Sequence, residues 1–208
     1  MSLYVALDGP DGCGKSSQAA ALAAFLQQNG HDALHVREPG STPVGEALRE
    51  LLLSNDTGEL QPITEVLLFS AARSELVQRV VAPALRAGRV VVAERCYLST
   101  AVYQLLASEP PASALQLAWF EDLTRRVHGA HLPDAIFVLD VSAEVSAQRR
   151  GERTDDRIEA RGDAFHRRVR DGFLAAADRE PRAVVVDATR PFDDVQAALR
   201  AELQRRLP

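Results

Sequence analysis

The chain alternates short apolar runs with longer stretches of helical periodicity. Apolar runs of strand length lie at residues 3–7, 33–36, 89–93, 135–141 and 183–187. Their apolar character is largely continuous, which is typical of strands that are covered on both faces. Helical patterns lie at residues 16–28, 43–53, 62–87, 99–107, 113–127, 143–150, 163–178 and 193–207. This order predicts an α/β fold in three layers, with helices on both faces of a five-stranded parallel sheet.

Proline and glycine mark several of the predicted helix boundaries. Pro43 and Pro62 open two of the helical stretches, and Gly30 and Gly88 follow two others. Proline in the first turn and glycine after the last are the usual punctuation of helices. Pro83 lies inside the pattern at 62–87, and we expect it to kink that helix or to end it early.

Length and composition narrow the class of protein. The 208 residues, 46% of them hydrophobic, can bury one sizeable core, so residues 1–208 are expected to form a single domain. A formal net charge of −5 gives no general attraction for nucleic acid or for an anionic membrane. No apolar run reaches the roughly 20 residues that span a bilayer, and the N-terminus does not read as a secretory signal. We therefore expect a cytoplasmic protein without nucleic-acid or membrane partners.

The strongest local motif lies directly after the first predicted strand. Residues 9–16 read Gly-Pro-Asp-Gly-Cys-Gly-Lys-Ser, a full match to G-x-x-x-x-G-K-[ST] that opens a helix. The glycines let backbone N–H groups surround phosphate oxygens, and the helix N-terminus adds a favourable dipole. Lys15 is expected near the β and γ phosphates, and Ser16 on Mg²⁺. The predicted triphosphate-binding residues are Gly9, Pro10, Asp11, Gly12, Cys13, Gly14, Lys15, Ser16 and Ser17.

Two arginines point to a second, anionic substrate. Arg37 and Arg95 follow the second and third predicted strands, where ligands of open α/β sheets gather. A phosphorylated acceptor brings further negative charge beside a triphosphate, so fixed guanidiniums are needed to bind and align it. We assign both arginines to the acceptor phosphate. The alternative is that they form ordinary surface ion pairs.

Six short motifs occur in a fixed order along nearly the whole chain. They are Asp8-Gly9 with Asp11, Arg37-Glu38-Pro39-Gly40, Phe69-Ser70-Ala71-Ala72-Arg73, Glu94-Arg95, Ser99-Thr100 with Tyr103-Gln104, and Asp156-Arg157-Ile158-Glu159. Together they resemble the thymidylate kinase family of P-loop nucleoside monophosphate kinases. The resemblance implies a P-loop NTPase fold and transfer of the ATP γ-phosphate to dTMP, giving dTDP for dTTP synthesis, with Mg²⁺ as cofactor. It also implies a homodimer, for which the helices starting at residues 62 and 99 offer surplus apolar residues.

The resemblance also assigns roles around the acceptor. Phe69 would stack on the thymine ring, and Arg73, on the same helix face, would hydrogen-bond the carbonyl edge. Tyr103 would lie against the sugar and disfavour a 2′-hydroxyl, and Asp11 would accept a hydrogen bond from the 3′-hydroxyl. The alternatives are a core role for Phe69 and a turn role for Asp11. The predicted acceptor-binding residues are Asp11, Arg37, Phe69, Arg73, Arg95, Ser99, Tyr103 and Gln104.

A carboxylate for the metal is expected at the end of the third strand. Glu94 stands where the family normally has aspartate, and its side chain reaches one methylene further. Asp8, just before the phosphate loop, is a second candidate for organising metal-bound water. The predicted metal set is therefore Ser16, Glu94 and Asp8.

An arginine-rich segment predicts a lid. Residues 148–157 carry four arginines between two helices, and we expect a lid at about 149–162 that closes over the phosphates and excludes water. The alternative is a solvated charged face. Some family members carry a catalytic arginine after the loop aspartate, where this chain has Gly12, so the lid should supply it. The predicted catalytic residues are Lys15 and Arg95, with Arg153 as the first choice from the lid and Arg149 as the next. Arg150 and Arg157 are further candidates, and the alternative for Arg157 is a structural pairing with Glu159.

The stretch after Gln104 departs from the family. Residues 105–111 replace a glycine-rich segment that normally ends in arginine, which leaves the acceptor base open. The alternatives are a thymidylate-kinase-like protein with another acceptor, or a deoxynucleoside kinase, which would need a carboxylate base for a neutral 5′-hydroxyl. A third alternative is a nucleotide-dependent switch without a small-molecule acceptor.

Overall fold

The structure, a computed structural model, describes residues 2–150 and 156–206, except for the side chain of Arg150. Five parallel strands form one sheet in the order β2-β3-β1-β4-β5. The strands are β1 (Leu3–Asp8), β2 (Ala33–Arg37), β3 (Val90–Glu94), β4 (Ala135–Asp140) and β5 (Ala183–Asp187). The predicted α/β fold with a five-stranded parallel sheet is confirmed, and every predicted strand boundary lies within one residue of the observed one.

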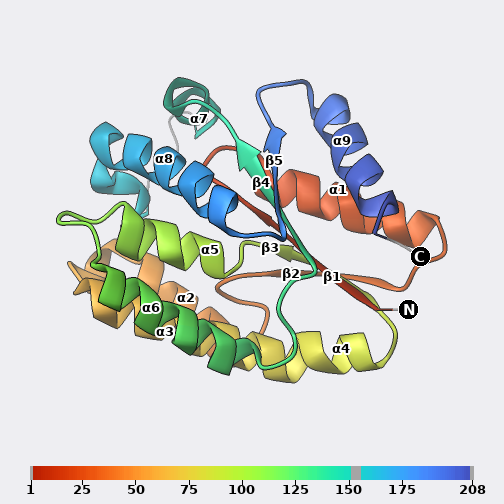
Figure 1. Cartoon of the computed structure of the whole chain (residues 1–208), viewed down its shortest axis with the longest axis horizontal. Coiled ribbons are helices and arrows are strands. Elements are labelled where there is room, and N and C mark those ends of the chain that lie inside the picture. The colour runs from red at the N-terminus through yellow and green to blue at the C-terminus, as the bar shows by residue number, and fades with distance from the viewer. Residues whose placement is uncertain (1, 151–155, 207–208) are drawn as a thin grey trace.

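Helices cover both faces of this sheet (Figure 1). One face carries α1 (Lys15–Gln28) and α9 (Phe192–Gln204). The other carries α3 (Pro62–Leu76), α6 (Ala114–His128) and α8 (Asp163–Arg179). Side chains of β1 alternate between the two cores, with Tyr4 and Ala6 facing the second group of helices and Val5 and Leu7 facing the first. The three predicted layers follow from this alternation.

Two of the predicted helices contain π-helical turns. The pattern at 62–87 forms α3, a π-helical segment at Val77–Val81 and α4 (Ala82–Arg86). Pro83 therefore does not end the helix, because the wider turn lies at the point where its ring would meet the preceding carbonyls. The pattern at 99–107 forms α5 (Tyr97–Thr100) followed by a π-helical segment at Ala101–Leu106.

The remaining helices frame one end of the sheet. They are α2 (Pro43–Leu53) and α7 (Ala143–Arg150), together with short 3-10 turns at Asn55–Thr57 and Glu159–Arg161. Thr42 fixes the start of α2, because its hydroxyl accepts a hydrogen bond from the Gly45 N–H at 2.9 Å. Within the described ranges, no helix combines the length and the apolar character needed to cross a membrane.

A histidine is buried at the end of α6. His128 is fully buried, with Nδ1 2.9 Å from the Thr124 carbonyl and its ring edge-on to Tyr97 at a centroid distance of 5.6 Å. Burial and the positive charges of Arg73 and Arg182 lower the pKa of His128 to about 4. The folded protein therefore holds this ring neutral under conditions where an exposed histidine begins to protonate.

Mild acid should destabilise the fold through His128. The unfolded chain, with a histidine pKa of about 6.5, binds the proton more readily than the folded chain. The free energy of unfolding should therefore fall as the pH drops from about 6.5 to about 4, with a His128 contribution of at most about 3 kcal/mol. Urea unfolding of the wild type and His128→Phe across this range measures that contribution. The variant should lose less stability, and equal losses would contradict a depressed histidine pKa.

Candidate functional site

A cavity of about 550 Å³ opens at the carboxyl ends of the central strands. It extends from the loop after β1 to the inner faces of α3 and α5, so one space joins the phosphate loop to the predicted base-binding residues. The predicted residues that line it are Asp11, Gly12, Gly14, Lys15, Ser16, Ser17, Phe69, Arg73, Glu94, Arg95, Ser99, Tyr103, Gln104 and Arg149. The structure therefore brings together most of the side chains that were singled out from the sequence.

The phosphate loop is shaped by its glycines and closed by its lysine. Lys15 is the only lysine in the chain, and its Nζ donates to the carbonyls of Gly9 at 2.9 Å and Pro10 at 2.7 Å. Gly12 has a φ of +76°, and a Cβ there would lie 2.5 Å from the Ser146 carbonyl oxygen of α7. A side chain at this position would therefore require the backbone of the loop or of α7 to shift.

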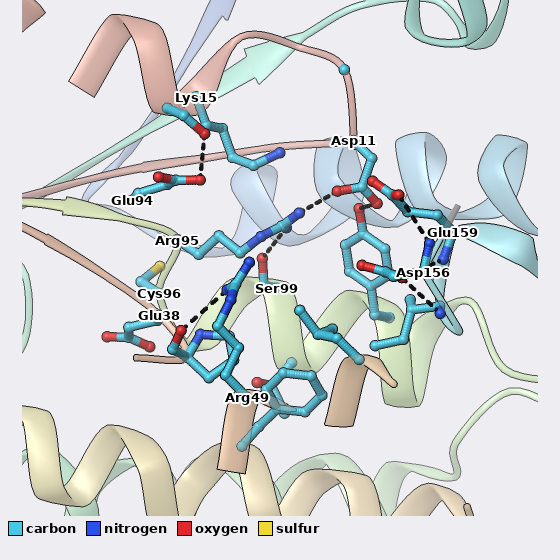
Figure 2. A pocket seen from close by; sticks show the side chains of 18 of the residues that line it. Asp11, Lys15, Glu38, Arg49, Glu94, Arg95, Cys96, Ser99, Asp156 and Glu159 are labelled. Carbon is cyan, nitrogen blue, oxygen red and sulfur yellow. Dashed lines mark hydrogen bonds and ion pairs between the residues drawn. The ribbon is translucent and has the colours of Figure 1, made fainter. Parts of the chain in front are cut away.

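Arg95 lies at the centre of the cavity and links three elements. One of its terminal nitrogens donates to Asp11 of the phosphate loop, and the other donates to the Ser99 hydroxyl at 2.9 Å (Figure 2). The Tyr103 hydroxyl donates to the second oxygen of Asp11 at 2.6 Å. Arg95 has a φ of 70°, a left-handed conformation that is held by the hydrogen bond from its N–H to the Leu7 carbonyl at 2.8 Å. The backbone is therefore constrained to direct this side chain into the cavity.

The charges of this group support one another. Burial opposes ionisation of Asp11, but the charges of Arg95 and Lys15 outweigh it and hold the pKa of Asp11 well below its usual range. Burial likewise disfavours the charged form of Arg95, but Asp11 raises its pKa well above the ordinary value. Burial and the charge of Asp11 raise the pKa of Tyr103. At neutral pH the group is therefore a buried ion pair with a neutral tyrosine donor.

Two of the predicted metal ligands meet at the mouth of the loop. The Ser16 hydroxyl donates to Glu94 Oε1 at 2.6 Å, so the longer glutamate side chain still reaches the serine. A hydroxyl and a carboxylate are hard oxygen ligands of the kind that Mg²⁺ prefers. No group of three or more acidic, histidine or cysteine side chains suited to a metal occurs in the parts of the chain that are described. The pair fits a Mg²⁺ ion that completes its shell with phosphate oxygens and water.

Asp8 has a different environment from the one expected. It is fully buried, and its carboxylate accepts hydrogen bonds from the N–H groups of Gly9 at 2.9 Å, Cys96 at 3.1 Å and Ser99 at 3.0 Å. The Ser99 hydroxyl also donates to it, at 2.6 Å. With both oxygens engaged, Asp8 joins the phosphate loop to the start of α5, which leaves Ser16 and Glu94 as the metal candidates.

The arginines near β2 also differ from the prediction. Arg37 forms a half-exposed ion pair with Glu46 at 2.8 Å and lies beside the main cavity, in a shallow adjoining pocket. Arg49 of α2 lines both spaces and donates to the Pro39 carbonyl at 3.1 Å. Burial and the nearby charges of Arg37 and Arg95 lower the pKa of Arg49. Sequence reasoning missed Arg49, because only the orientation of α2 shows which way it faces.

The far end of the cavity is lined by Phe69 and Arg73 of α3. Arg73 is only 3% exposed, and its Nε donates to Glu38 at 2.6 Å. Its Nη2 donates to the Cys96 carbonyl at 3.2 Å and to the Thr100 hydroxyl at 3.0 Å. Phe69 both lines the cavity and packs against the apolar core, so a core contact does not remove it from the cavity wall. The guanidinium is thus fixed in place before any ligand binds.

The amino-acid sequence is similar to those of known proteins along nearly its whole length. A family model described as thymidylate kinase matches residues 7–199. The chain belongs to the thymidylate kinase family. It is 43% identical to a thymidylate kinase of Thermomicrobium roseum, covering 97% of this chain and 94% of the relative. It is 40% identical to that of Caulobacter vibrioides (98% and 97% covered) and 39% identical to that of Symbiobacterium thermophilum (100% and 95% covered).

The stretch at 105–111, where the sequence indicates a departure from the family pattern, lies to one side of the cavity. Within the described residues, none of 105–111 lines the cavity. Arg168 of α8 binds this stretch instead, donating to the Ala107 carbonyl at 3.0 Å and pairing with Glu109 at 2.7 Å. The described walls of the cavity therefore do not include any of residues 105–111.

The lid arginines of this thymidylate kinase family member are described only in part. Arg149 lines the cavity and donates to the Ala188 carbonyl at 2.8 Å. Arg153, with the rest of residues 151–155, lies outside the described residues. Arg157 has a structural role, but its partner is Glu65 at 2.6 Å and not Glu159, because its side chain extends toward α3 and the end of α2. Arg157 therefore anchors the C-terminal part of the predicted lid to α2 and α3.

Proposed function

We propose that this chain phosphorylates dTMP to dTDP, with ATP as phosphoryl donor and Mg²⁺ as cofactor. The observation that carries the proposal is the single cavity that joins the phosphate loop at Lys15 to the pocket of Phe69 and Arg73. Arg95 lies between these two ends, where the phosphate of one nucleotide would meet the γ-phosphate of the other. Family membership supports the same pair of substrates. The proposed partners are these small nucleotides, and neither nucleic acid nor a membrane.

The donor end supplies positioning and charge. Backbone N–H groups of the loop and the N-terminus of α1 suit the β-phosphate, and Lys15 can leave its carbonyl partners to reach the β and γ oxygens. Ser16 and Glu94 would hold Mg²⁺. When bound, the metal neutralises charge on the β and γ phosphates. The protein itself aligns the triphosphate with the acceptor.

The acceptor phosphate is assigned to Arg95 and Arg49, because both line the cavity whereas Arg37 is paired with Glu46 beside it. Asp11 has acceptor capacity left for the 3′-hydroxyl, since a carboxylate oxygen can accept more than one hydrogen bond. Tyr103, held by Asp11 at 2.6 Å, would stand against the sugar and disfavour a 2′-hydroxyl. These contacts hold the attacking phosphate oxygen in line.

The negative charge on the phosphoryl group during transfer would be stabilised by Lys15, Arg95 and an arginine of the lid. Within the lid at 149–162, Arg153 is the first candidate and Arg149, which lines the cavity, is the next. Closure would exclude water, so that dTMP competes successfully with water for the phosphoryl group. We assign these parts to one kinase domain, residues 1–208, working in the cytoplasm.

An acceptor panel with a Lys15→Ala variant tests the function. The wild type should phosphorylate dTMP with a higher kcat/KM than dUMP, dCMP, dGMP or thymidine, measured by coupled ADP release. Lys15→Ala should lower kcat by roughly 10³-fold or more, because no other lysine can replace it. Arg79→Ala, which removes an exposed surface pair with Glu75, is the control and should keep full activity. Preference for thymidine would indicate a nucleoside kinase, and ATP turnover indifferent to all acceptors would indicate a switch.

We also propose a homodimer that forms through α2, α3 and α6. These helices lie side by side, with α3 in contact with both others, and expose large apolar side chains (Figure 1). The exposed residues are Val44, Leu51, Ile63, Leu67, Leu115 and Trp119. The helix at 99–107, which was expected to contribute, is instead largely buried inside the molecule. An apolar face of this kind, spread over three neighbouring helices, is typical of an obligate interface.

Leu67→Glu tests this interface. Leu67 belongs to this apolar face and is 49% exposed. A charge at this position would lose its hydration when two copies of the chain associate. We expect sedimentation equilibrium to show a dimer for the wild type and a monomer for the variant. Val185→Glu, at a residue of β5 that is 47% exposed, is the matched control and should stay dimeric. A monomeric wild type, or a variant that still dimerises, would refute the assignment.

A further inference from the structure

Glu65 is a buried carboxylate that binds three polar side chains. It lies in the first turn of α3 and is only 1% exposed. Its Oε1 accepts hydrogen bonds from Arg157 and from Arg161, each at 2.6 Å. Its Oε2 accepts from the Gln104 amide nitrogen at 3.0 Å. Both carboxylate oxygens are therefore committed, and one of them is bound to a residue that lines the cavity.

This contact determines which end of the Gln104 amide faces the cavity. A glutamine side chain carries an NH₂ donor at one end and a carbonyl acceptor at the other. A carboxylate offers only acceptors, so the NH₂ group must face Glu65. Gln104 is 2% exposed and borders the cavity, so its carbonyl oxygen is the part of the amide that a ligand there would meet.

A donor lies next to this acceptor. The Arg73 guanidinium borders the same end of the cavity and donates to Thr100, one helical turn before Gln104. This wall of the cavity therefore presents a hydrogen-bond donor, the Arg73 guanidinium, beside an acceptor, the Gln104 carbonyl. Thymine and uracil match it, since O4 accepts and the adjacent N3–H donates. Cytosine presents the reverse order, with an amino donor at C4 and an acceptor at N3, and would leave both protein groups unpaired.

We propose that Glu65 is a positioning residue for base selection. It holds the Gln104 carbonyl toward the acceptor base and so favours a pyrimidine with an N3–H group over cytosine. The inference rests on the proposed function in one respect, the placement of the acceptor base beside Arg73 and Gln104. It adds a residue that does not touch the substrate but determines which hydrogen bonds the substrate meets.

The two arginines keep Glu65 in this role. Both donate to Oε1, which leaves Oε2 for Gln104. Arg157 is itself fixed, because its Nε donates to the Leu52 carbonyl at 3.0 Å. Glu65 and Gln104 are themselves buried, at 1% and 2% exposure, and hydrogen-bonded to each other, which leaves the amide little freedom to rotate when the cavity fills.

Glu65→Gln tests the proposal, because a glutamine at this position can donate to the Gln104 carbonyl and allow the amide to turn. The dTMP:dCMP ratio of kcat/KM should fall by about 10- to 100-fold. Calorimetry should show the same change in the ratio of the two Kd values. The dTMP:dUMP ratio should stay constant, since both bases carry O4 and N3–H. Glu75→Gln, on the same helix but in a surface pair with Arg79, is the matched control and should change neither ratio.

Gln104→Leu keeps the proposal testable if Glu65→Gln does not fold, as judged by circular dichroism and Tm. It removes the amide and should lower the dTMP:dCMP ratio by a similar factor. In the Gln104→Leu background, Glu65→Gln should have no further effect on the ratio. A folded Glu65→Gln or Gln104→Leu protein with the wild-type ratio overturns the inference. Failure of the wild type to phosphorylate dTMP would refute the proposed function instead, and the Kd ratios would still decide the role of Glu65.

Discussion

The buried ion pair between Asp11 and Arg95 is the interaction around which the site is built. It joins the loop after β1 to the segment after β3, and the buried Asp11 carboxylate is stabilised by the charge of Arg95, whose side chain is 21% exposed. Ser99 and Tyr103 add hydrogen bonds from the helix that follows. The left-handed backbone of Arg95 is held by the sheet itself. The cavity is therefore fixed by the strands rather than by its ligands.

Arginine and lysine are divided between the two ends of the cavity. Arginines 49, 73 and 95 carry planar guanidiniums that are partly or wholly held by carbonyls, hydroxyls or carboxylates. This suits an acceptor that must be recognised in one orientation. Lys15, the only lysine in the chain, is a compact charge on a flexible stem that rests on loop carbonyls. It suits a triphosphate whose charge moves during transfer.

Sequence reasoning succeeded where the signal was local. The strands were found because apolar runs and turns lie within a few residues of each other, and the phosphate loop because strand, glycines and helix are contiguous. Side-chain direction was not predictable, since it depends on how distant elements pack. Asp8 was expected at a metal but accepts hydrogen bonds from the start of α5. Arg37 was expected at the acceptor phosphate but pairs with Glu46 outside the cavity that Arg49 lines. Glu65 gave no signal, because an acidic residue in a first helical turn is ordinarily a solvated one.

The most direct test of the site is a crystal structure of the protein with dTMP and a non-hydrolysable ATP analogue. The thymine ring should lie against Phe69 with its O4–N3 edge toward Arg73 and Gln104, and its 5′-phosphate should contact Arg49 and Arg95 and face the γ position above Lys15. A dTMP molecule bound in the opposite orientation, or bound outside this cavity, would contradict the assignment of one continuous site to both nucleotides.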